Sequence, residues 1–246
     1  MGRFDGKVVL VTGGCRNTGV AIVEKFRREG AKVYACDIGV EPQPGVFACD
    51  ISDAAQVTAM FDAIAAESGR LDILVNNAAH QGIGKPFVEM DPAYLMEVLG
   101  VNVKGGFQVT QQAVNRFFRK QESRGVVVFL TSNTAMRAIR NRTAYCASKG
   151  AINSMVRSLA LDLGPLGIRV NACAPGYIYT VRWDALDETK KARRRANCPL
   201  GREAKGSDIA NVVAFLASDD SGNMTGEIVT CDGGCSCQHM PADVDV

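Results

Sequence analysis

Short, strongly apolar runs alternate with amphipathic stretches along most of the chain. The apolar runs fall at residues 7–12, 31–36, 45–49, 71–75, 125–131, 168–171 and 227–230. Runs of this length, apolar on both faces, are typical of strands that lie inside a parallel sheet. Helical periodicity is found at residues 18–29, 53–67, 105–120, 144–163 and 207–217.

This alternation predicts an α/β fold: a Rossmann-type, doubly wound parallel sheet of about seven strands with helices on both faces. No linker, repeat or low-complexity tract interrupts the pattern, so we expect a single domain over residues 1–246. The least regular part is 177–206, which is rich in charge and has no clear strand. Residues 235–246 are expected to form a C-terminal tail.

A glycine-rich turn after the first apolar run predicts a phosphate-binding site. The sequence there is Thr12-Gly-Gly-Cys-Arg-Asn-Thr-Gly19, and a helix follows at once. Backbone N–H groups at a helix amino end, with the helix dipole, attract an anion, and glycine lets the anion come close. The residues expected to contact the cofactor in this turn are Gly13, Arg16, Asn17, Thr18 and Gly19.

The second apolar run ends at Asp37, and an acid in this place predicts a preference for NAD. Its carboxylate can accept hydrogen bonds from both ribose hydroxyls of adenosine and would repel a 2′-phosphate. Arg16 favours the opposite choice, because a cation in the turn could receive that phosphate. We give Asp37 more weight, since a long arginine can swing away.

Tyr145 and Lys149 stand four residues apart in a helical stretch and therefore share one face. A tyrosine with a pKa near 10 is a poor base at neutral pH. A cation ~5 Å away is worth ~3 kcal/mol at an effective dielectric constant of ~20, or roughly two pKa units. We therefore expect Tyr145 to exchange a proton with a substrate oxygen near pH 7 to 8.

Seven motifs in the correct order resemble those of the short-chain dehydrogenase/reductase family, from residue 7 to residue 234. They are Thr12, Gly13 and Gly19 in the turn; Asn76-Asn77-Ala78-Ala79; Asn102; Ser132; the Tyr145 and Lys149 pair; Pro175-Gly176, followed by Thr180; and the closing stretch from Met224 to Gly234. Two departures from the family pattern occur. Asn17 replaces the middle glycine of the turn, where asparagine tolerates a left-handed backbone, and Ala79 replaces the last glycine of N-N-A-G.

The resemblance implies a catalytic tetrad of Asn102, Ser132, Tyr145 and Lys149. Tyr145 would be the general acid/base, and Lys149 would lower its pKa and hold the nicotinamide ribose. Ser132 would donate a hydrogen bond to the substrate oxygen, and Asn102 would hold a water that links Lys149 to solvent. The resemblance also implies cofactor contacts from Ile38, Asp50, Ile51, Asn77, Ala78, Pro175, Gly176, Ile178 and Thr180. A homotetramer is the family expectation, with 100–120 and 144–163 as the helices between subunits.

Composition narrows the possible partners. With 28 basic and 26 acidic residues the net charge is +2, which gives no reason to expect nucleic acid. No apolar stretch approaches the ~18 residues of a membrane helix. The acidic start does not resemble a signal peptide, so we expect a cytoplasmic location. Nine cysteines are then best explained as free thiols. Cys231, Cys235, Cys237 and His239 match no common zinc spacing, and we expect no metal.

Together these features predict an NAD(H)-dependent oxidoreductase that interconverts a secondary alcohol and a ketone. Basic residues at Arg137, Arg140, Arg142 and within 181–198 suggest an anionic substrate, although a salt-bridged surface explains them as well. Two alternatives stay open. One is a 3-oxoacyl-[acyl-carrier-protein] reductase, which usually prefers NADPH. The other is a non-catalytic nucleotide-sensing protein on the same fold.

Overall fold

The computed structural model describes residues 2–239, apart from the side chain of Arg182. The strands in it form one parallel sheet in the order β3-β2-β1-β4-β5-β6-β7. Their bounds are β1 (Val8–Thr12), β2 (Lys32–Asp37), β3 (Val46–Ala48), β4 (Ile73–Asn76), β5 (Val126–Leu130), β6 (Arg169–Pro175) and β7 (Ile228–Cys231). The order reverses between β1 and β4, which lie side by side in parallel register. Crevices for nucleotides occur at such reversals.

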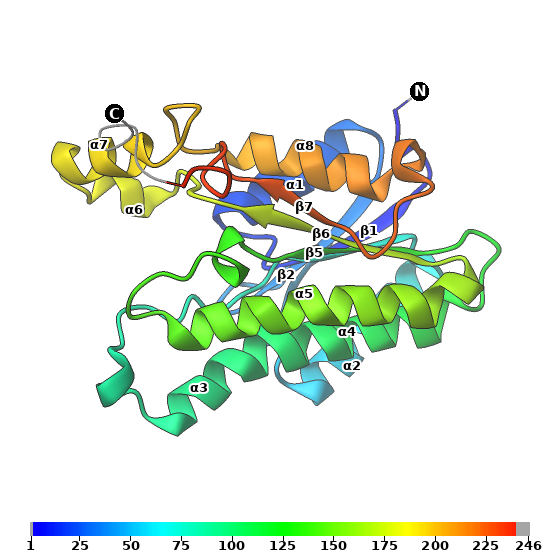
Figure 1. Ribbon diagram of the computed structural model, residues 1–246. Helices are drawn as coiled ribbons and strands as arrows, with labels where there is room; N and C mark the ends of the chain where they lie inside the picture. The colour runs from blue at the N-terminus through cyan, green and yellow to red at the C-terminus, as the bar shows by residue number, and fades with distance from the viewer. Residues whose placement is uncertain (1, 240–246) are drawn as a thin grey trace.

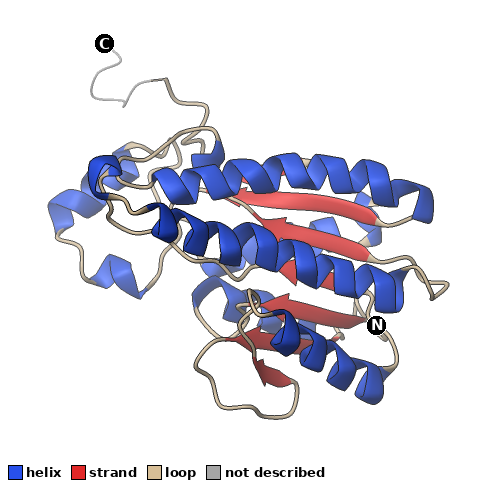
Figure 2. Ribbon diagram, turned by 90° about the horizontal axis from the view of Figure 1, so that it is seen from below, coloured by secondary structure: helices blue, strands red, loops and turns tan. Residues whose placement is uncertain are grey.

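Helices cover both faces of the sheet (Figure 1). Helices α1 (Asn17–Arg28) and α8 (Gly206–Ala217) lie on one face. Helices α2 (Ala54–Ser68), α4 (Gly106–Ala113) and α5 (Thr143–Leu163) lie on the other, and Figure 2 views the sheet through this second layer. Alternate strand residues feed two cores: Leu10 packs with α2, α4 and α5, whereas Val9 and Val11 pack with α1 and α8. The predicted doubly wound sheet is therefore confirmed.

The predicted helix at 105–120 is too short at its amino end. Helix α3 (Pro92–Leu99) leads through a π-helical turn, η2 (Gly100–Gly105), into α4 and a second π-helical turn, η3 (Val114–Phe118). The start of α3 carries a clear signal, because Asp91 caps it by accepting the N–H of Ala93 at 2.8 Å and proline occupies the first helical position. Strand β6 likewise continues four residues beyond the predicted end at 171.

The segment 177–206 contains two helices, α6 (Val181–Asp184) and α7 (Glu188–Ala196). Figure 1 shows them beyond the carboxyl ends of the strands. Asp187 caps the start of α7, its side chain accepting the N–H of Lys190 at 2.7 Å, and the helix buries no residue of its own. The short turns are η1 (Phe87–Glu89), η4 (Asn133–Ala135), η5 (Gly164–Leu166) and η6 (Asp219–Ser221). Of the predicted tail 235–246, residues 240–246 lie outside the described part of the chain.

Candidate active site

The turn between β1 and α1 has the form that an anion requires. Asn17 has a φ of 46°, so asparagine does occupy the left-handed position that the sequence required of it. A Cβ at Gly19 would stand 1.9 Å from the carbonyl oxygen of Gly13, so only glycine fits there. Arg16 precedes α1 without capping it, which leaves the first N–H groups of the helix without a side-chain acceptor. These features fit the predicted pyrophosphate of a dinucleotide.

Thr12 fastens this turn to the end of β4. Its hydroxyl oxygen accepts the N–H groups of Asn77 and Ala78, each at 3.1 Å. The amide nitrogen of Asn77 donates in return to the carbonyls of Thr12 and Gly13, at 3.0 and 2.8 Å. Asn77 and Ala78 therefore lie at the predicted crevice, with the Asn77 side chain used to hold the turn.

The predicted adenosine end of the crevice contains Asp37 and its neighbours. One carboxylate oxygen of Asp37 accepts the N–H of Ile38 at 2.9 Å. The side chain of Ile38 is 56% exposed, which leaves an apolar surface beside the carboxylate. Arg16 lies on the same side, since its guanidinium donates to the carbonyl of Ile38 at 2.5 Å. The Asp37 carboxylate and the Arg16 guanidinium thus both contact the main chain of Ile38.

Asp50 and Ile51, the predicted adenine contacts, follow β3. Asp50 accepts two hydrogen bonds at 2.8 Å, from the N–H and the hydroxyl of Ser52. The side chain of Ile51 is buried and packs against Gly105, where any Cβ would clash with it. A direct contact with the cofactor would therefore come from Asp50 or from the main chain of Ile51.

Ser132, Tyr145 and Lys149 meet at the carboxyl end of β5. Ser132 is buried and caps η4, with its hydroxyl accepting the N–H of Thr134 at 3.2 Å. Lys149 is buried one turn after Tyr145 on α5, and its ammonium nitrogen lies 5.5 Å from the centre of the tyrosine ring. The same nitrogen donates to the carbonyl of Leu130 at 2.8 Å, which anchors α5 to β5.

The predicted lowering of the Tyr145 pKa is wrong for the protein without cofactor. Burial raises the pKa of Tyr145, and the Ser132 hydroxyl and the Arg142 guanidinium only partly oppose this rise. Burial also lowers the pKa of Lys149 to about 8. The prediction takes Lys149 as a full charge at an effective dielectric constant of ~20, whereas in the structure burial disfavours that charge and the ammonium donates a hydrogen bond to Leu130. Tyr145 is therefore protonated near neutral pH and poised to donate.

Asn102 lies behind these three residues, in the π-helical turn η2. Its amide nitrogen donates to the carbonyl of His80 at 3.0 Å and to the hydroxyl of Ser148 at 2.9 Å, and its oxygen accepts the N–H of His80 at 2.7 Å. The Ser148 hydroxyl donates onward to the carbonyl of Tyr145 at 2.7 Å. Both amide protons are used, so the side chain fastens the loop after β4 to the catalytic helix. The predicted water beside Lys149 stays a prediction.

The segment between the end of β6 and the start of α6 contains four of the predicted cofactor contacts: Pro175, Gly176, Ile178 and Thr180. Gly176 packs so closely on Asp232 that a Cβ would stand 2.6 Å from the Asp232 Cβ. Ile178 pairs with Ala204 in an isolated parallel bridge, which holds both ends of the segment together. Thr180 precedes α6, and its carbonyl accepts the N–H of Trp183 at 2.8 Å. All four residues thus border the carboxyl edge of the sheet.

Most basic residues of this segment have partners. Arg195 forms a two-pronged ion pair with Glu203, at 2.8 and 2.9 Å, and Lys190 and Lys191 pair with acids of their own helix. Arg194 differs, because its guanidinium lies over two aromatic rings and no ion pair joins it to an acid within residues 2–239. Its guanidinium carbon lies 5.6 Å from the ring centre of Tyr177 and 5.4 Å from that of Trp183.

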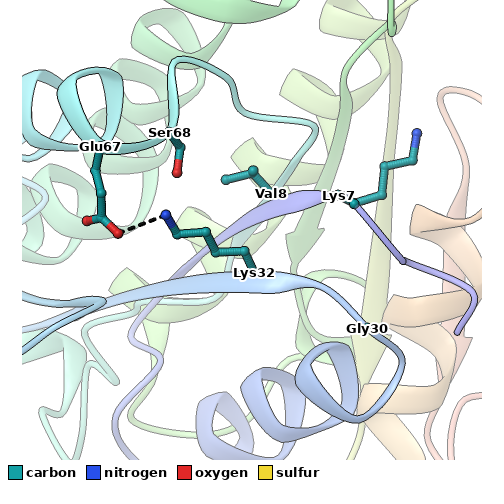
Figure 3. Close-up of a pocket in the computed structure, with 7 residues that line it drawn as sticks. Lys7, Val8, Gly30, Lys32, Glu67 and Ser68 are labelled. Carbon is teal, nitrogen blue, oxygen red and sulfur yellow. Dashed lines mark ion pairs between the residues drawn. The ribbon is translucent and has the colours of Figure 1, made fainter.

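Other features of the described residues lie away from this site. A shallow pocket of about 390 Å³ opens at the amino ends of β1 and β2, where Lys32 pairs with Glu67 at 2.8 Å (Figure 3). No group of three or more His, Cys, Asp or Glu side chains in that part of the chain could hold a metal ion. Within the same residues, no helix is long and apolar enough to span a membrane.

Sequence reasoning missed several residues that shape the site. The main chain of His80 is held on both sides by Asn102, and its ring packs edge-on against the Tyr94 ring, with the ring centres 5.6 Å apart. Ser148 and Arg142 were not assigned roles next to Tyr145. Ser148 lies three residues after Tyr145 and one before Lys149, and this spacing could have predicted that it shares the inner face of α5.

Known proteins match the chain over most of its length. A family model described as enoyl-(acyl carrier protein) reductase matches residues 15–236. The chain is 34% identical to the 3-oxoacyl-[acyl-carrier-protein] reductase FabG of Thermotoga maritima, covering 94% of this chain and 98% of that protein. It is 36% identical to a 3alpha-hydroxysteroid dehydrogenase of Mediterraneibacter gnavus, covering 94% and 97%. The crystal structure of a levodione reductase superposes with a TM-score of 0.89, at 31% identity over 96% of this chain and all of that one.

Proposed function

The chain belongs to the short-chain dehydrogenase/reductase family, and we propose that it uses NAD(H) to interconvert a secondary alcohol and a ketone. One observation carries the proposal. Ser132, Tyr145 and Lys149 converge at the carboxyl end of β5, and the uncapped start of α1 and Asp37 lie along the same edge of the sheet. An acid/base group thus stands beside a site fitted to a dinucleotide. Relatives that are dehydrogenases and reductases leave no support for a non-catalytic sensor.

The reaction needs a proton at the substrate oxygen and a hydride at the substrate carbon. A bound nicotinamide dinucleotide supplies or accepts the hydride. Tyr145, protonated in its buried place, donates its proton to the ketone oxygen in reduction and takes it back in oxidation. The Ser132 hydroxyl stabilises the charge that develops on that oxygen. Lys149, held by Leu130, would contact the nicotinamide ribose and stabilise the tyrosinate during turnover.

The dinucleotide would lie along the carboxyl edge of the sheet. Gly13, Arg16, Asn17, Thr18 and Gly19 would surround the pyrophosphate, and Asp37, Ile38, Asp50 and Ile51 the adenosine. Asn77, Ala78, Pro175, Gly176, Ile178 and Thr180 would border the nicotinamide half. Gly13 packs so closely on the end of β4 that a Cβ there would stand 2.8 Å from the Cα of Ala78, which holds the two sides of this edge together.

NAD is proposed over NADP because the repulsion between the Asp37 carboxylate and a 2′-phosphate outweighs the attraction that the movable Arg16 guanidinium would provide. Asp37→Ser should raise the ratio of NADPH to NADH turnover by roughly 100-fold, since two charges ~5 Å apart interact by ~3 kcal/mol. The ratio is measured as kcat/KM for each cofactor. Arg16→Gln is the matched comparison and should lower NADPH turnover more than NADH turnover, because the Arg16 guanidinium is the cation that could receive the 2′-phosphate. A wild-type enzyme that already prefers NADPH would overturn the proposal.

The segment 177–206 is proposed to form a lid over the substrate. Arg194 is the best candidate for an anionic group of the substrate, because Asp187, Glu188 and Glu203 are engaged with other cations. Burial raises the pKa of Tyr177 while Arg194 and Arg137 lower it, so both guanidinium groups act on the side chain that follows Gly176. A substrate carboxylate, phosphate or sulfonate would add the missing negative charge there.

Reduction of a 3-oxoacyl thioester is the second candidate. The similarity to the Thermotoga maritima reductase favours it, and Asp37 opposes it if NADPH is required. Turnover of an acetoacetyl thioester with NADH and NADPH separates the two. Strong NADPH-dependent reduction of the thioester, with no oxidation of simple alcohols, would favour this candidate.

The most direct test is a screen for NAD⁺ reduction over a panel of secondary alcohols, with Tyr145→Phe as the control. Loss of the phenolic proton should lower kcat about 10²- to 10⁴-fold while dinucleotide binding stays within a few fold. Binding is measured by quenching of Trp183 fluorescence or by calorimetry. If Tyr145→Phe left turnover unchanged, Tyr145 would not be the acid/base.

The homotetramer and the cytoplasmic location stay predictions. In the stretch 100–120, Val114, Phe117 and Phe118 are buried within the subunit, whereas Phe107 on α4 is 46% exposed. Leu161 on α5 is 79% exposed. Light scattering measures the oligomeric state, and fractionation of cells measures the location.

A further inference from the structure

Two cysteines that are far apart in the sequence meet where the segment 177–206 lies against the turn after β7. The sulfur of Cys198, just after α7, lies 3.4 Å from the sulfur of Cys235, just after β7. The exposed fractions of these residues are 4% and 6%. The Cys235 thiol also donates to the carbonyl of Asn197 at 2.7 Å. We propose that Cys198 and Cys235 form a disulfide under oxidising conditions, which fastens the segment 177–206 to the turn after β7.

The main chain already brings the two cysteines into register. The N–H of Leu200 donates to the carbonyl of Gly233 at 3.1 Å, and Pro199 packs against Gly234 so closely that a Cβ there would stand 2.9 Å from the proline ring. A disulfide bond is ~2.05 Å long, so the sulfurs have on the order of 1.4 Å to close. Small side-chain rotations can supply such a distance.

The turn that holds Cys235 is anchored next to the catalytic serine. Asp232 accepts the N–H and the hydroxyl of Ser236, at 2.8 and 2.6 Å, and the amide of Asn133 at 3.1 Å. Asn133 directly follows Ser132. The disulfide would therefore connect the segment that carries Trp183 and Arg194 to a fixed point of the active site.

A hydroperoxide is an oxidant small enough to reach this buried pair. One thiolate attacks the O–O bond of hydrogen peroxide and becomes a sulfenic acid, with release of one water after proton uptake. The second thiol attacks the sulfenic sulfur, which forms the S–S bond and releases a second water. Two thiols lose two electrons and two protons, and one peroxide is reduced to two waters. Burial raises the pKa of Cys198 and raises that of Cys235 to about 12, so the reaction should be slow at pH 7 and faster at pH 9.

The test treats the full chain with hydrogen peroxide and maps its cysteines by mass spectrometry without reduction. The expected product is a peptide pair joined through Cys198 and Cys235, 2 Da lighter than the two free peptides. Cys237, two residues further on, is exposed, and Cys49 raises the pKa of its buried neighbour Cys36. A linkage of Cys235 to Cys237, or of Cys36 to Cys49 with Cys198 and Cys235 still free, would overturn the proposal.

Thermal unfolding gives a second readout. The bond closes a long loop, so the oxidised wild type should melt roughly 5–10 °C above the reduced form. Cys198→Ser and Cys235→Ser should lose this shift, and Cys237→Ser, the matched control, should keep it. Equal melting of the oxidised and reduced wild type, with the linkage absent, would show that the sulfurs only pack together. Mass and melting need no substrate, so this outcome is independent of the proposed function.

Discussion

The two sides of the active site are built in different ways. On the side of the sheet, Thr12, Asn102, Ser148 and Lys149 are buried polar groups, and each is held by main-chain or side-chain hydrogen bonds. On the side of the segment 177–206, α7 buries no residue and is held by the exposed pair of Lys190 with Asp187, by the partly buried pair of Arg195 with Glu203, by Arg194 over two rings and by a thiol contact.

We infer from this difference that catalysis depends on the sheet side of the site and substrate specificity on the segment 177–206. Buried hydrogen bonds in a low dielectric fix a side chain firmly, because leaving one unmade costs about 1–3 kcal/mol. Exposed ion pairs are worth 0–1 kcal/mol and are easily rearranged. The sheet side can therefore place a proton donor reproducibly, and the segment can change its sequence, and its ligand, without disturbing that donor.

The largest effect is expected where the sheet side is tightest, at Gly19. Gly19→Ala would place a Cβ 1.9 Å from the carbonyl oxygen of Gly13, and since both groups belong to the main chain, the turn must move. We expect turnover to fall on the order of 10³-fold and the free energy of unfolding to drop by ~1–3 kcal/mol. Steady-state kinetics over a range of NADH concentrations and urea unfolding measure the two effects.

Gly150→Ala is the matched control for this change. Gly150 lies in the interior of α5, and a Cβ there would meet nothing within 4 Å. Alanine is favoured over glycine in a helix by about 0.5–1 kcal/mol, so stability should rise slightly and turnover should persist. Similar losses in both variants would mean that the turn has no special role.

Lys149 should show a conflict between stability and activity. Burial lowers its pKa from 10.5 to about 8, which corresponds to a cost of roughly 3 kcal/mol for keeping the charge at pH 7. Lys149→Met removes this cost and loses the hydrogen bond to Leu130, so the free energy of unfolding should rise by ~1–2 kcal/mol. Turnover should fall roughly 10²-fold. Urea unfolding and NAD⁺ reduction measure the two.

The pH dependence of the stability difference between the wild type and Lys149→Met tests whether the buried charge of Lys149 is its cause. Between pH 8 and 10.5 the unfolded chain binds a proton on Lys149 that the folded chain has released, so the wild type gains stability as the pH rises through this window. The advantage of Lys149→Met should be full below pH 8 and vanish towards pH 10.5. Lys104→Met, at an exposed lysine, is the matched control. An advantage that did not change with pH would assign the gain to packing instead.

The same contrast between the two sides explains which features of the structure could be predicted from the sequence. The strands and the residues at their ends follow from apolar runs and from motifs at fixed spacing, and Asn17 met the left-handed position as expected. The Tyr145 pKa was wrong because its sign depends on burial, which no spacing reveals. Helices α6 and α7 were missed because they have little apolar periodicity. The hydrogen bonds between Asn102 and His80 join residues that are 22 apart in the sequence, so no local sequence pattern predicts them.

The smallest predicted effect tests the segment itself. Arg194→Gln removes a charge stacked on Tyr177 and Trp183 and should lower kcat/KM about 10-fold for a secondary alcohol that carries a carboxylate, or ~1.4 kcal/mol. For the uncharged amide of the same alcohol the change should stay within about twofold. Arg193→Gln, at the exposed neighbour on α7, should affect neither substrate. If Arg194→Gln weakened both substrates equally and lowered the melting temperature, Arg194 would be a brace for the two rings, and the anion would have to be sought elsewhere on the segment. If only the acidic substrate suffered, specificity and chemistry would reside on opposite sides of one site.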